Sequence, residues 1–186
     1  MKIVVETERL ILREILPSDI EGMYELDADP EVHKYLRNKP VSSKEQVANV
    51  INTIRQQYID NRIGRWAIID KNTNEFIGWA GLKFITEETN NHKNYYDLGY
   101  RLIKRYWGRG IATETALASL EYAFEKLKTN KVYAIADCEN SSSNKILKKV
   151  GLKYIETFDL EGIKHNWYKI DKREFENKKL AAKKRF

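Results

Sequence analysis

The segment between Tyr95 and Leu127 constrains the fold of this chain more than any other part of the sequence. Residues 95–103 are rich in aromatic and aliphatic side chains and predict a strand. Apolar residues at helical spacing then predict an amphipathic helix over residues 111–128. Gly108 and Gly110 lie in the turn between them, where glycine permits backbone conformations that other residues avoid. Because a helix start has free N–H groups and partial positive charge, this turn is suited to bind an anion.

Further elements are predicted on both sides of this unit. Capping boxes at residues 18–21 (Ser-Asp-Ile-Glu) and 43–46 (Ser-Lys-Glu-Gln) predict two helix starts, with a loop through residues 29–40 that borders a binding cleft. Gly78 and Gly81 fall inside a predicted strand, which indicates a bulge or a close backbone approach. Strands are predicted at residues 9–13, 65–70, 75–85, 131–137, 152–158 and 164–170, and a short helix at 140–150. Together they predict one α/β domain with a mixed central sheet flanked by helices.

Composition limits the class of protein further. With 186 residues, of which 42% are hydrophobic, the chain suits one domain with a proper core. Cys138 is the only cysteine, and the three histidines show no ligand spacing, so we expect neither an internal disulfide nor a metal site. No apolar run approaches the roughly 20 residues that span a bilayer, and Glu6 and Glu8 interrupt any signal-peptide core. We therefore expect a cytoplasmic protein without a membrane segment.

The net charge of +6 is concentrated near the C-terminus. Residues 171–186 carry seven basic and three acidic side chains, which accounts for four of those six charges. We therefore predict a domain at residues 1–170 that is followed by a basic tail. Such a tail can contact RNA or ribosomes, or it can be a solvated terminus without a function of its own. The charge alone does not define the function.

The glycine turn does not match two common phosphate sites. A P-loop ends in Gly-Lys-Ser/Thr, which this sequence lacks. A dinucleotide fold has Gly-x-Gly-x-x-Gly after an early strand, whereas this turn has Gly-x-Gly-x-x-Thr and lies past the middle of the chain. Taken alone, the two glycines are more typical of a plain tight turn.

Three longer motifs decide between these alternatives. The segment from Arg105 to Gly110 resembles motif A of the GCN5-related N-acetyltransferases (GNAT), (Gln/Arg)-x-x-Gly-x-(Gly/Ala), and residues 97–100 (DLGY) are similar to the acidic-x-Gly-Tyr strand before it. Residues 6–13 (ETERLILR) are similar to the opening Thr-Glu-Arg-Leu-x-Leu-Arg of the RimJ/RimL-like branch, the ribosomal-protein N-acetyltransferases. Residues 140–152 (NSSSNKILKKVGL) match that branch's signature Asn-x-x-Ser-x-(Arg/Lys)-(Val/Ile)-Leu-x-Lys-x-Gly-(Phe/Leu). The resemblance spans nearly the whole chain and implies a GNAT-like fold that uses acetyl-CoA and no metal.

The resemblance also implies which residues hold the cofactor. Backbone groups of Leu102 and Ile103 would bond the pantetheine arm where the sheet opens, and the pyrophosphate would lie against the glycine turn. For Asn140 a helix cap is the alternative role, and Trp107 is expected to pack the turn. The implied cofactor-binding residues are Leu102, Ile103, Arg105, Gly108, Arg109, Gly110, Ala112, Thr113, Asn140 and Asn144.

Asp97 and Ser143 are the catalytic residues that the resemblance implies. Asp97 would take the proton of the amine, directly or through water. An ordinary Asp is a weak base, and an ion pair with a lysine or arginine is the alternative role. Ser143 would protonate the departing thiolate, with a plain helix-start preference as the alternative. A backbone N–H near Leu102 would stabilise the oxyanion. Cys138 is expected to be a small buried residue rather than a nucleophile.

The expected activity is transfer of an acetyl group from acetyl-CoA to a primary amine by direct attack. The branch implies a peptide or protein N-terminal α-amine as acceptor, and the alternative is a small amine such as a polyamine, amino acid analogue or aminoglycoside. Acidic residues in the cleft, for which Asp27, Glu87 and Glu88 are candidates, would favour polycations. A ribosome-associated CoA-binding protein with little turnover is a hypothesis of another class. The sequence leaves the acceptor and the oligomeric state open.

Overall fold

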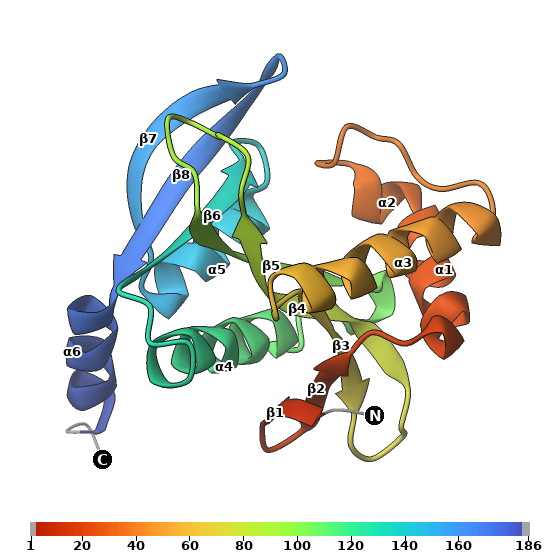
Figure 1. Cartoon of the computed structure of the whole chain (residues 1–186), viewed down its shortest axis with the longest axis horizontal. Helices are drawn as coiled ribbons and strands as arrows, with labels where there is room; N and C mark the ends of the chain where they lie inside the picture. Colours follow the sequence, from red (N-terminus) through yellow and green to blue (C-terminus); the bar gives the residue numbers. More distant parts are fainter. Residues whose placement is uncertain (1–2, 184–186) are drawn as a thin grey trace.

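A computed structural model describes residues 3–183, and its centre is one eight-stranded sheet (Figure 1). The strands are ordered β1-β2-β3-β4-β5-β6-β8-β7. β5 and β6 are parallel, and the other neighbouring pairs are antiparallel. The strands are β1 (Ile3–Glu6), β2 (Leu10–Glu14), β3 (Arg65–Asp70), β4 (Phe76–Ile85), β5 (Tyr95–Leu102), β6 (Lys131–Asp137), β7 (Lys153–Leu160) and β8 (Ile163–Asp171). The predicted α/β domain with a mixed sheet is confirmed.

Helices cover both faces of this sheet, with α1, α2 and α3 gathered on one side of Figure 1 and α4 and α5 on the other. Successive residues of a strand point to opposite faces. Tyr100 of β5 contacts α5, whereas its neighbour Arg101 contacts Asp27 of α1, so α1 and α5 lie on opposite faces. The helices are α1 (Ile20–Ala28), α2 (Pro30–His33), α3 (Lys44–Asp60), α4 (Ile111–Glu125), α5 (Ser141–Val150) and α6 (Lys172–Lys183), with 3-10 turns η1 (Pro17–Asp19) and η2 (Lys104–Tyr106).

β5 and β6 separate soon after they meet. Their register pair joins Asp97 to Tyr133. By contrast, β5 pairs with β4 as far as Leu102, and β6 pairs with β8 along its full length. The part of β5 after Asp97 therefore faces an opening, which we call the split. Backbone groups along a strand edge can bond an extended molecule that enters beside it.

The glycines of β4 show the close approach that the sequence predicts. At Gly78 the φ angle is +152°, and a Cβ would lie 2.2 Å from the Arg101 carbonyl oxygen on β5. A register shift in the pairing of β3 with β4 marks a bulge at the same place. Gly81 is confined for a different reason, because a Cβ there would lie 2.7 Å from the Trp66 ring.

The start of α1 differs from its prediction. Ser18 lies within η1 and does not cap the helix, which follows Asp19. The Asp19 carboxylate accepts bonds from both Arg13 Nη atoms at 2.7 Å and from the Leu16 N–H at 2.8 Å. Asp19 turns inward because the buried Arg13 guanidinium needs a carboxylate partner. The predicted capping box is therefore wrong here.

The region between α1 and α3 contains a helix where the sequence predicts a loop. Asp29 caps α2 by accepting a bond from the Glu31 N–H at 2.8 Å, and Pro30 occupies the first helical turn. α2 has only four residues, which is too short for a periodic signal. The predicted cap of α3 is confirmed, since Ser43 accepts a bond from the Gln46 N–H at 3.4 Å.

The C-terminal segment is a helix in the part that the structure describes, which differs from a solvated tail. Phe175 of α6 is only 4% exposed and packs on Phe124 of α4, with ring centroids 5.2 Å apart. Lys179 pairs with two carboxylates of α4. The sequence does not predict this helix, because residues 172–183 contain few apolar side chains among many charged ones. Lys184 and Arg185 of the predicted tail lie outside the described residues.

Candidate functional site

The turn between β5 and α4 has the geometry of an anion site. Gly108 and Gly110 have φ angles of +75° and +77°, in the left-handed region that favours glycine. Gly110 is the N-cap of α4, and its carbonyl accepts a bond from the Glu114 N–H at 3.0 Å. The N–H groups of residues 111–113 belong to the first turn of α4 and have no partner within the helix. They include those of Ala112 and Thr113, two of the predicted cofactor-binding residues. The glycine conformations and the helix start are those the sequence predicts, and the binding of a pyrophosphate here stays a prediction.

Arginine side chains line this turn. Those of Arg105 and Arg109 lie over the Tyr106 ring, at 4.8 and 5.3 Å from its centroid. Arg105 also pairs with Glu25 of α1. On the other side, Arg9 donates two bonds of 3.2 Å to the Arg109 carbonyl. The turn is thus electropositive and held from both sides.

The N-terminal motif contributes to the site through Glu114, in the first turn of α4. Arg9 donates to this carboxylate from Nε at 2.8 Å and from Nη2 at 2.5 Å. Thr7 donates from its hydroxyl at 2.5 Å. The motif is visible in the sequence, but its role is not, because Glu114 lies more than 100 residues further along the chain.

β5 joins the turn through Leu102 and Ile103. The Ile103 N–H donates to the Ile77 carbonyl and its C=O accepts from the Tyr106 N–H, both at 2.9 Å. Since both groups are used, the structure does not favour the predicted contact of Ile103 with the arm. Alternate residues of a strand direct their N–H groups to opposite neighbours, so that of Leu102 faces the split. The Trp107 indole donates to the Leu102 carbonyl at 2.8 Å, which ties the turn to the end of β5, while the residue is 45% exposed.

The start of α5 lies on the same face as Tyr100. Asn140 is the N-cap and accepts a bond from the Ser143 N–H at 3.0 Å, as its alternative role predicts. The Ser143 hydroxyl lies 3.1 Å from the Tyr100 hydroxyl. Burial raises the pKa of Tyr100 to about 12, so this phenol stays protonated at neutral pH. Tyr100 is a functional candidate that the motif comparison leaves unassigned.

Asn144 has a structural role that the sequence does not reveal. It is 8% exposed, and its amide nitrogen donates to the carbonyls of Asp137 and Asn140 at 2.8 Å. Its oxygen accepts from Asn166 at 2.8 Å and from Tyr168 at 2.6 Å. An amide side chain has two donor hydrogens and two acceptor sites, and all four are used. The structure therefore does not favour the predicted cofactor contact of Asn144, which instead fixes α5 to β6 and β8.

Asp97 lies where β5 and β6 meet, on the face opposite Ser143. Its carboxylate pairs with the Arg65 guanidinium, which also donates to the Asp97 and Gly81 carbonyls at 2.6 and 2.5 Å. Burial raises the pKa of Asp97, and the charge of Arg65 opposes that shift. The ion pair is the alternative role that the sequence left open. The prediction that Asp97 is the base stays untested.

A second buried ion pair lies on the same face as Asp97. Asp27, at the end of α1, accepts a bond of 2.6 Å from Arg101 Nη1. The Trp79 ring lies between the two arginines, 5.0 Å from Arg101 and 5.5 Å from Arg65. His33 of α2 completes this group, with Nε2 3.6 Å from Asp27 Oδ1. We call Asp27, His33 and Arg101 the α1–α2 cluster.

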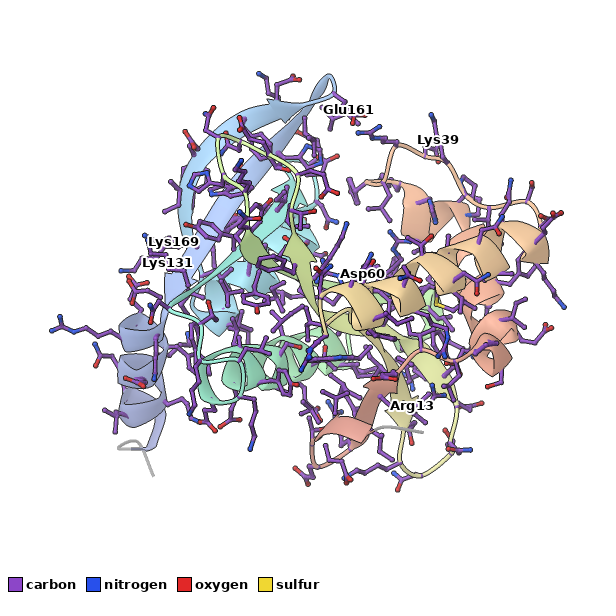
Figure 2. The ribbon with its side chains drawn as sticks, in the orientation of Figure 1. Arg13, Lys39, Asp60, Lys131, Glu161 and Lys169 are labelled. Atoms are coloured by element: carbon purple, nitrogen blue, oxygen red, sulfur yellow. The ribbon has the colours of Figure 1, made fainter. Side chains whose placement is uncertain are left out.

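The loop after α2 meets the β7–β8 hairpin. Arg37 pairs with Glu161 at the hairpin tip. Figure 2 shows Glu161 at the hairpin tip and Lys39, two residues after Arg37, on the loop across from it. The Arg37–Glu161 ion pair connects the loop after α2 to the β7–β8 edge of the sheet.

Residues 3–183 contain no group of three or more acidic, histidine or cysteine side chains placed to hold a metal ion. Over the same residues, no helix combines the length and apolarity that crossing a membrane requires. Cys138 is half-buried, and its Sγ lies 3.3 Å from Asn166 Oδ1.

Known proteins share both the sequence and the fold. Residues 9–153 match the acetyltransferase (GNAT) domain family. An uncharacterized N-acetyltransferase of Bacillus licheniformis, p20, is 31% identical over 163 residues, which cover 88% of this chain and 86% of p20.

Solved structures reproduce the fold at lower identity. A GNAT-family acetyltransferase from Bacillus anthracis superposes with a TM-score of 0.77 at 23% identity, covering 91% of this chain and 98% of its own. The ribosomal-protein-S5-alanine acetyltransferase of Vibrio fischeri gives 0.73 at 17%, covering 91% and 97%. The spermidine N-acetyltransferase of Vibrio cholerae, solved with CoA and spermine, gives 0.72 at 19%, covering 91% and 99%. The chain therefore belongs to the GNAT family and is an N-acetyltransferase, in a family that uses acetyl-CoA.

Proposed function

We propose that this N-acetyltransferase moves the acetyl group of acetyl-CoA to the N-terminal α-amine of a peptide or protein. The observation that carries the proposal is the split between β5 and β6, which leads from the Ser143–Tyr100 pair to the glycine turn before α4. An extended pantetheine arm fits along the β5 edge while the pyrophosphate reaches the helix start. The resemblance to the RimJ/RimL-like branch supports the choice of acceptor.

The pyrophosphate and the pantetheine arm of CoA would each meet matching groups on the protein. The pyrophosphate would bond the N–H groups of residues 108–110 and those of Ala112 and Thr113, beside the exposed Arg109 side chain. The N–H groups of Tyr106 and Trp107 are not available, because they already donate to the Ile103 and Lys104 carbonyls. The pantetheine arm would lie along the β5 edge in the split and pass the start of α5, with its thioester carbonyl at the Leu102 N–H. The charge of two phosphates is then met by amides and by arginine.

The chemistry is attack of a neutral amine nitrogen on the thioester carbonyl carbon. The Leu102 N–H, which faces the split, would stabilise the oxyanion that forms. When the C–S bond breaks, the Ser143 hydroxyl would give its proton to the thiolate. The Tyr100 hydroxyl would hold Ser143 in place by a hydrogen bond, and the proton that the amine nitrogen loses as the amide forms would restore the Ser143 hydroxyl. Arg65 occupies the Asp97 carboxylate, so we assign Asp97 a base role only through an intervening water.

The charges near the split favour an α-amine over a polyamine. A polycation would require carboxylates that are free to pair with it, as buried charges need partners. Asp27 and Asp97 face the split from the α1–α3 side, but Arg101 and Arg65 already neutralise them. An α-amine brings one charge, and its pKa of about 8 lies below the value of about 10.4 for a lysine amine. It therefore loses its proton more readily.

A panel of amines tests this acceptor assignment. Lysine-free peptides with free N-termini, the same peptides blocked by N-terminal acetylation, and spermidine are each mixed with protein and acetyl-CoA, and the release of CoA thiol is measured. We expect kcat/KM for the free peptides to exceed that for spermidine by at least about tenfold. The additional positive charges of spermidine find no free carboxylate, and one missing charge pair corresponds to roughly 1.4 kcal/mol or more. Turnover with spermidine alone would contradict the assignment. Equal turnover of free and blocked peptides would show that the α-amine is not the acceptor.

Two substitutions separate cofactor binding from chemistry. Ser143→Ala should lower kcat and leave the CoA dissociation constant unchanged, because Ser143 acts on the leaving group. Gly108→Val should weaken CoA binding itself, because a branched side chain would occupy the space of the pyrophosphate beside the turn. Titration calorimetry with CoA and steady-state kinetics measure the two effects independently.

The basic C-terminal residues do not favour an RNA contact. Three of those in α6 already have partners on the protein. A cation that is already paired releases fewer counterions from a nucleic acid and gains less affinity. The three residues are Lys172, Lys178 and Lys179.

A further inference from the structure

His33 is a buried polar side chain without a hydrogen bond among residues 3–183. The residue is 7% exposed, and both ring nitrogens are buried and unbonded. More than nine in ten buried polar groups in folded proteins have a partner, because an unpaired one costs stability. The other two histidines follow that rule, since His92 Nδ1 lies 2.6 Å from the Asn90 carbonyl and His165 Nδ1 lies 2.9 Å from the Ile163 carbonyl. His33 is therefore the exception that needs a reason.

The surroundings of His33 place it beside the reacting end of β5. Asp27 Oδ1 lies 3.6 Å from His33 Nε2 and accepts a bond from Arg101. Arg101 directly precedes Leu102, the residue whose N–H faces the split. The α1–α2 cluster therefore covers the end of β5 on the face opposite Ser143. An acceptor that reaches the thioester from this face would meet the cluster.

Burial, helped by the charge of Arg101, keeps the His33 imidazole neutral at neutral pH. Burial and the positive charge of Arg101 lower the pKa of His33, while Asp27 and Asp29 raise it by a smaller amount. These groups come from α1, from the cap of α2 and from β5. A neutral imidazole has one nitrogen with a lone pair that can accept a proton.

We propose that His33 contacts the acceptor amine and takes its proton, with Asp27 positioned to stabilise the imidazolium that forms. This inference rests on the proposed function and assigns its base. Asp97, the alternative, has its carboxylate engaged by Arg65, whereas both nitrogens of His33 are unbonded.

The steps balance in atoms and charge. The ammonium group of the acceptor gives one proton to the His33 ring, and the freed lone pair forms the new C–N bond to the thioester carbonyl. The C–S bond then breaks, and the thiolate takes the second amine proton through the Ser143 hydroxyl. His33 releases its proton to water. The products are the N-acetyl amide, CoA thiol and one proton.

A base changes how kcat/KM depends on pH, and this provides the test. An α-amine with a pKa of about 8 is only about 3% free at pH 6.5 and about 75% free at pH 8.5. With His33 as base, the protonated amine is also a substrate, so wild-type kcat/KM should change by no more than about fourfold between these pH values. In His33→Gln only free amine reacts, so kcat/KM should rise about 25-fold over the same range.

His92→Gln is the matched control, because His92 lies in the β4–β5 loop and has its own hydrogen bond. It should keep the wild-type pH profile. Asp97→Asn is the competing arm. A wild-type profile in His33→Gln together with a 25-fold rise in Asp97→Asn would overturn the proposal. If no amine is acetylated by the wild type, the proposed function fails before His33 is tested.

Thermal unfolding distinguishes a catalytic from a structural histidine. A side chain with no hydrogen bonds contributes little to folding through its polar atoms, so an apolar residue of similar size should be tolerated. His33→Leu is expected to unfold at the wild-type temperature or above it and to lose the flat pH profile. An unfolding temperature far below wild type, with an unchanged profile in His33→Gln, would show that His33 serves packing alone.

Discussion

Gly78 provides the sharpest test of how the sheet places the split. In Gly78→Ala the added methyl carbon would lie 2.2 Å from the Arg101 carbonyl oxygen and 2.9 Å from the Leu102 Cα. Favourable contacts between carbon atoms begin near 3.5 Å, so the end of β5 must move by on the order of 1 Å. Both contacts are with backbone atoms, and a rotamer change cannot relieve them.

The cost of this substitution has two sources. The backbone at Gly78 has a φ angle of +152°, and a non-glycine residue in such a region costs about 1–3 kcal/mol. Overpacking of a well-packed site costs about 1–3 kcal/mol more. For a chain of this size each kcal/mol lowers Tm by about 2–4 °C, so Gly78→Ala should unfold roughly 5–20 °C below wild type. Because a shift of about 1 Å at Leu102 misplaces the thioester, kcat/KM for acetyl-CoA should fall by about 100-fold.

Gly162→Ala is the control for the backbone term. Its φ angle is +85°, but no atom lies within 4 Å of an added Cβ, so the change should cost only the roughly 1–2 kcal/mol of left-handed backbone. Unfolding is followed by circular dichroism for both variants. If Gly78→Ala unfolds at the same temperature as Gly162→Ala and binds CoA like wild type, the close contact with β5 does not govern the split.

Four further outcomes follow from the site. Arg9→Ala should raise the CoA dissociation constant about tenfold and lower Tm little, because its exposed ion pair adds at most about 1 kcal/mol to stability; calorimetry and thermal melts measure both. Tyr100→Phe should lower kcat about tenfold without changing KM for acetyl-CoA, since it removes one bond to Ser143 worth roughly 1–1.5 kcal/mol. Asn144→Ala should cost about 2–4 kcal/mol in urea unfolding, because it leaves several buried groups unpaired. The pKa of His33 is lower in the folded state than in the unfolded state, where it is about 6.5. The contribution of His33 to stability is therefore complete above the unfolded pKa and is lost as pH falls toward the folded pKa. Urea unfolding at pH 7 and pH 5 should show a smaller loss of unfolding free energy in His33→Gln than in wild type.

Local signals in the sequence predict those elements whose cause is local. Residues 131–137 form a strand with the predicted bounds, and Gly151 ends α5 at a φ angle of +110°. The glycines of the turn likewise have the positive φ angles that their chemistry suggests. Each of these features depends on neighbours within a few positions, which is the range over which propensity and capping act.

Hydrogen-bond partners from distant segments explain what the sequence did not predict. Asn144 matches a cofactor motif, but partners on β6, on β8 and at the cap of α5 use its whole bonding capacity. Asp97 matches a catalytic position, but Arg65 reaches it from 32 residues away across the sheet. The pairing of Arg101 with Asp27 spans 74 residues. A motif gives the residue type at a position, whereas these roles depend on which side chains the fold brings alongside.

Under the proposed function, alternation along β5 would let one strand serve both reactants. Tyr100 points to the α5 face, where Ser143 would meet the leaving sulfur, and Arg101 points to Asp27 on the opposite face, where the acceptor would approach. The Leu102 N–H lies in the plane of the sheet, between these two faces, and points into the split. A shift of one residue in the pairing of β5 with β4 would exchange the two faces. The close approach at Gly78 and the bond from Ile103 to Ile77 hold that register at the end of β5, so the residues that fix the strand also fix which face is given to each reactant.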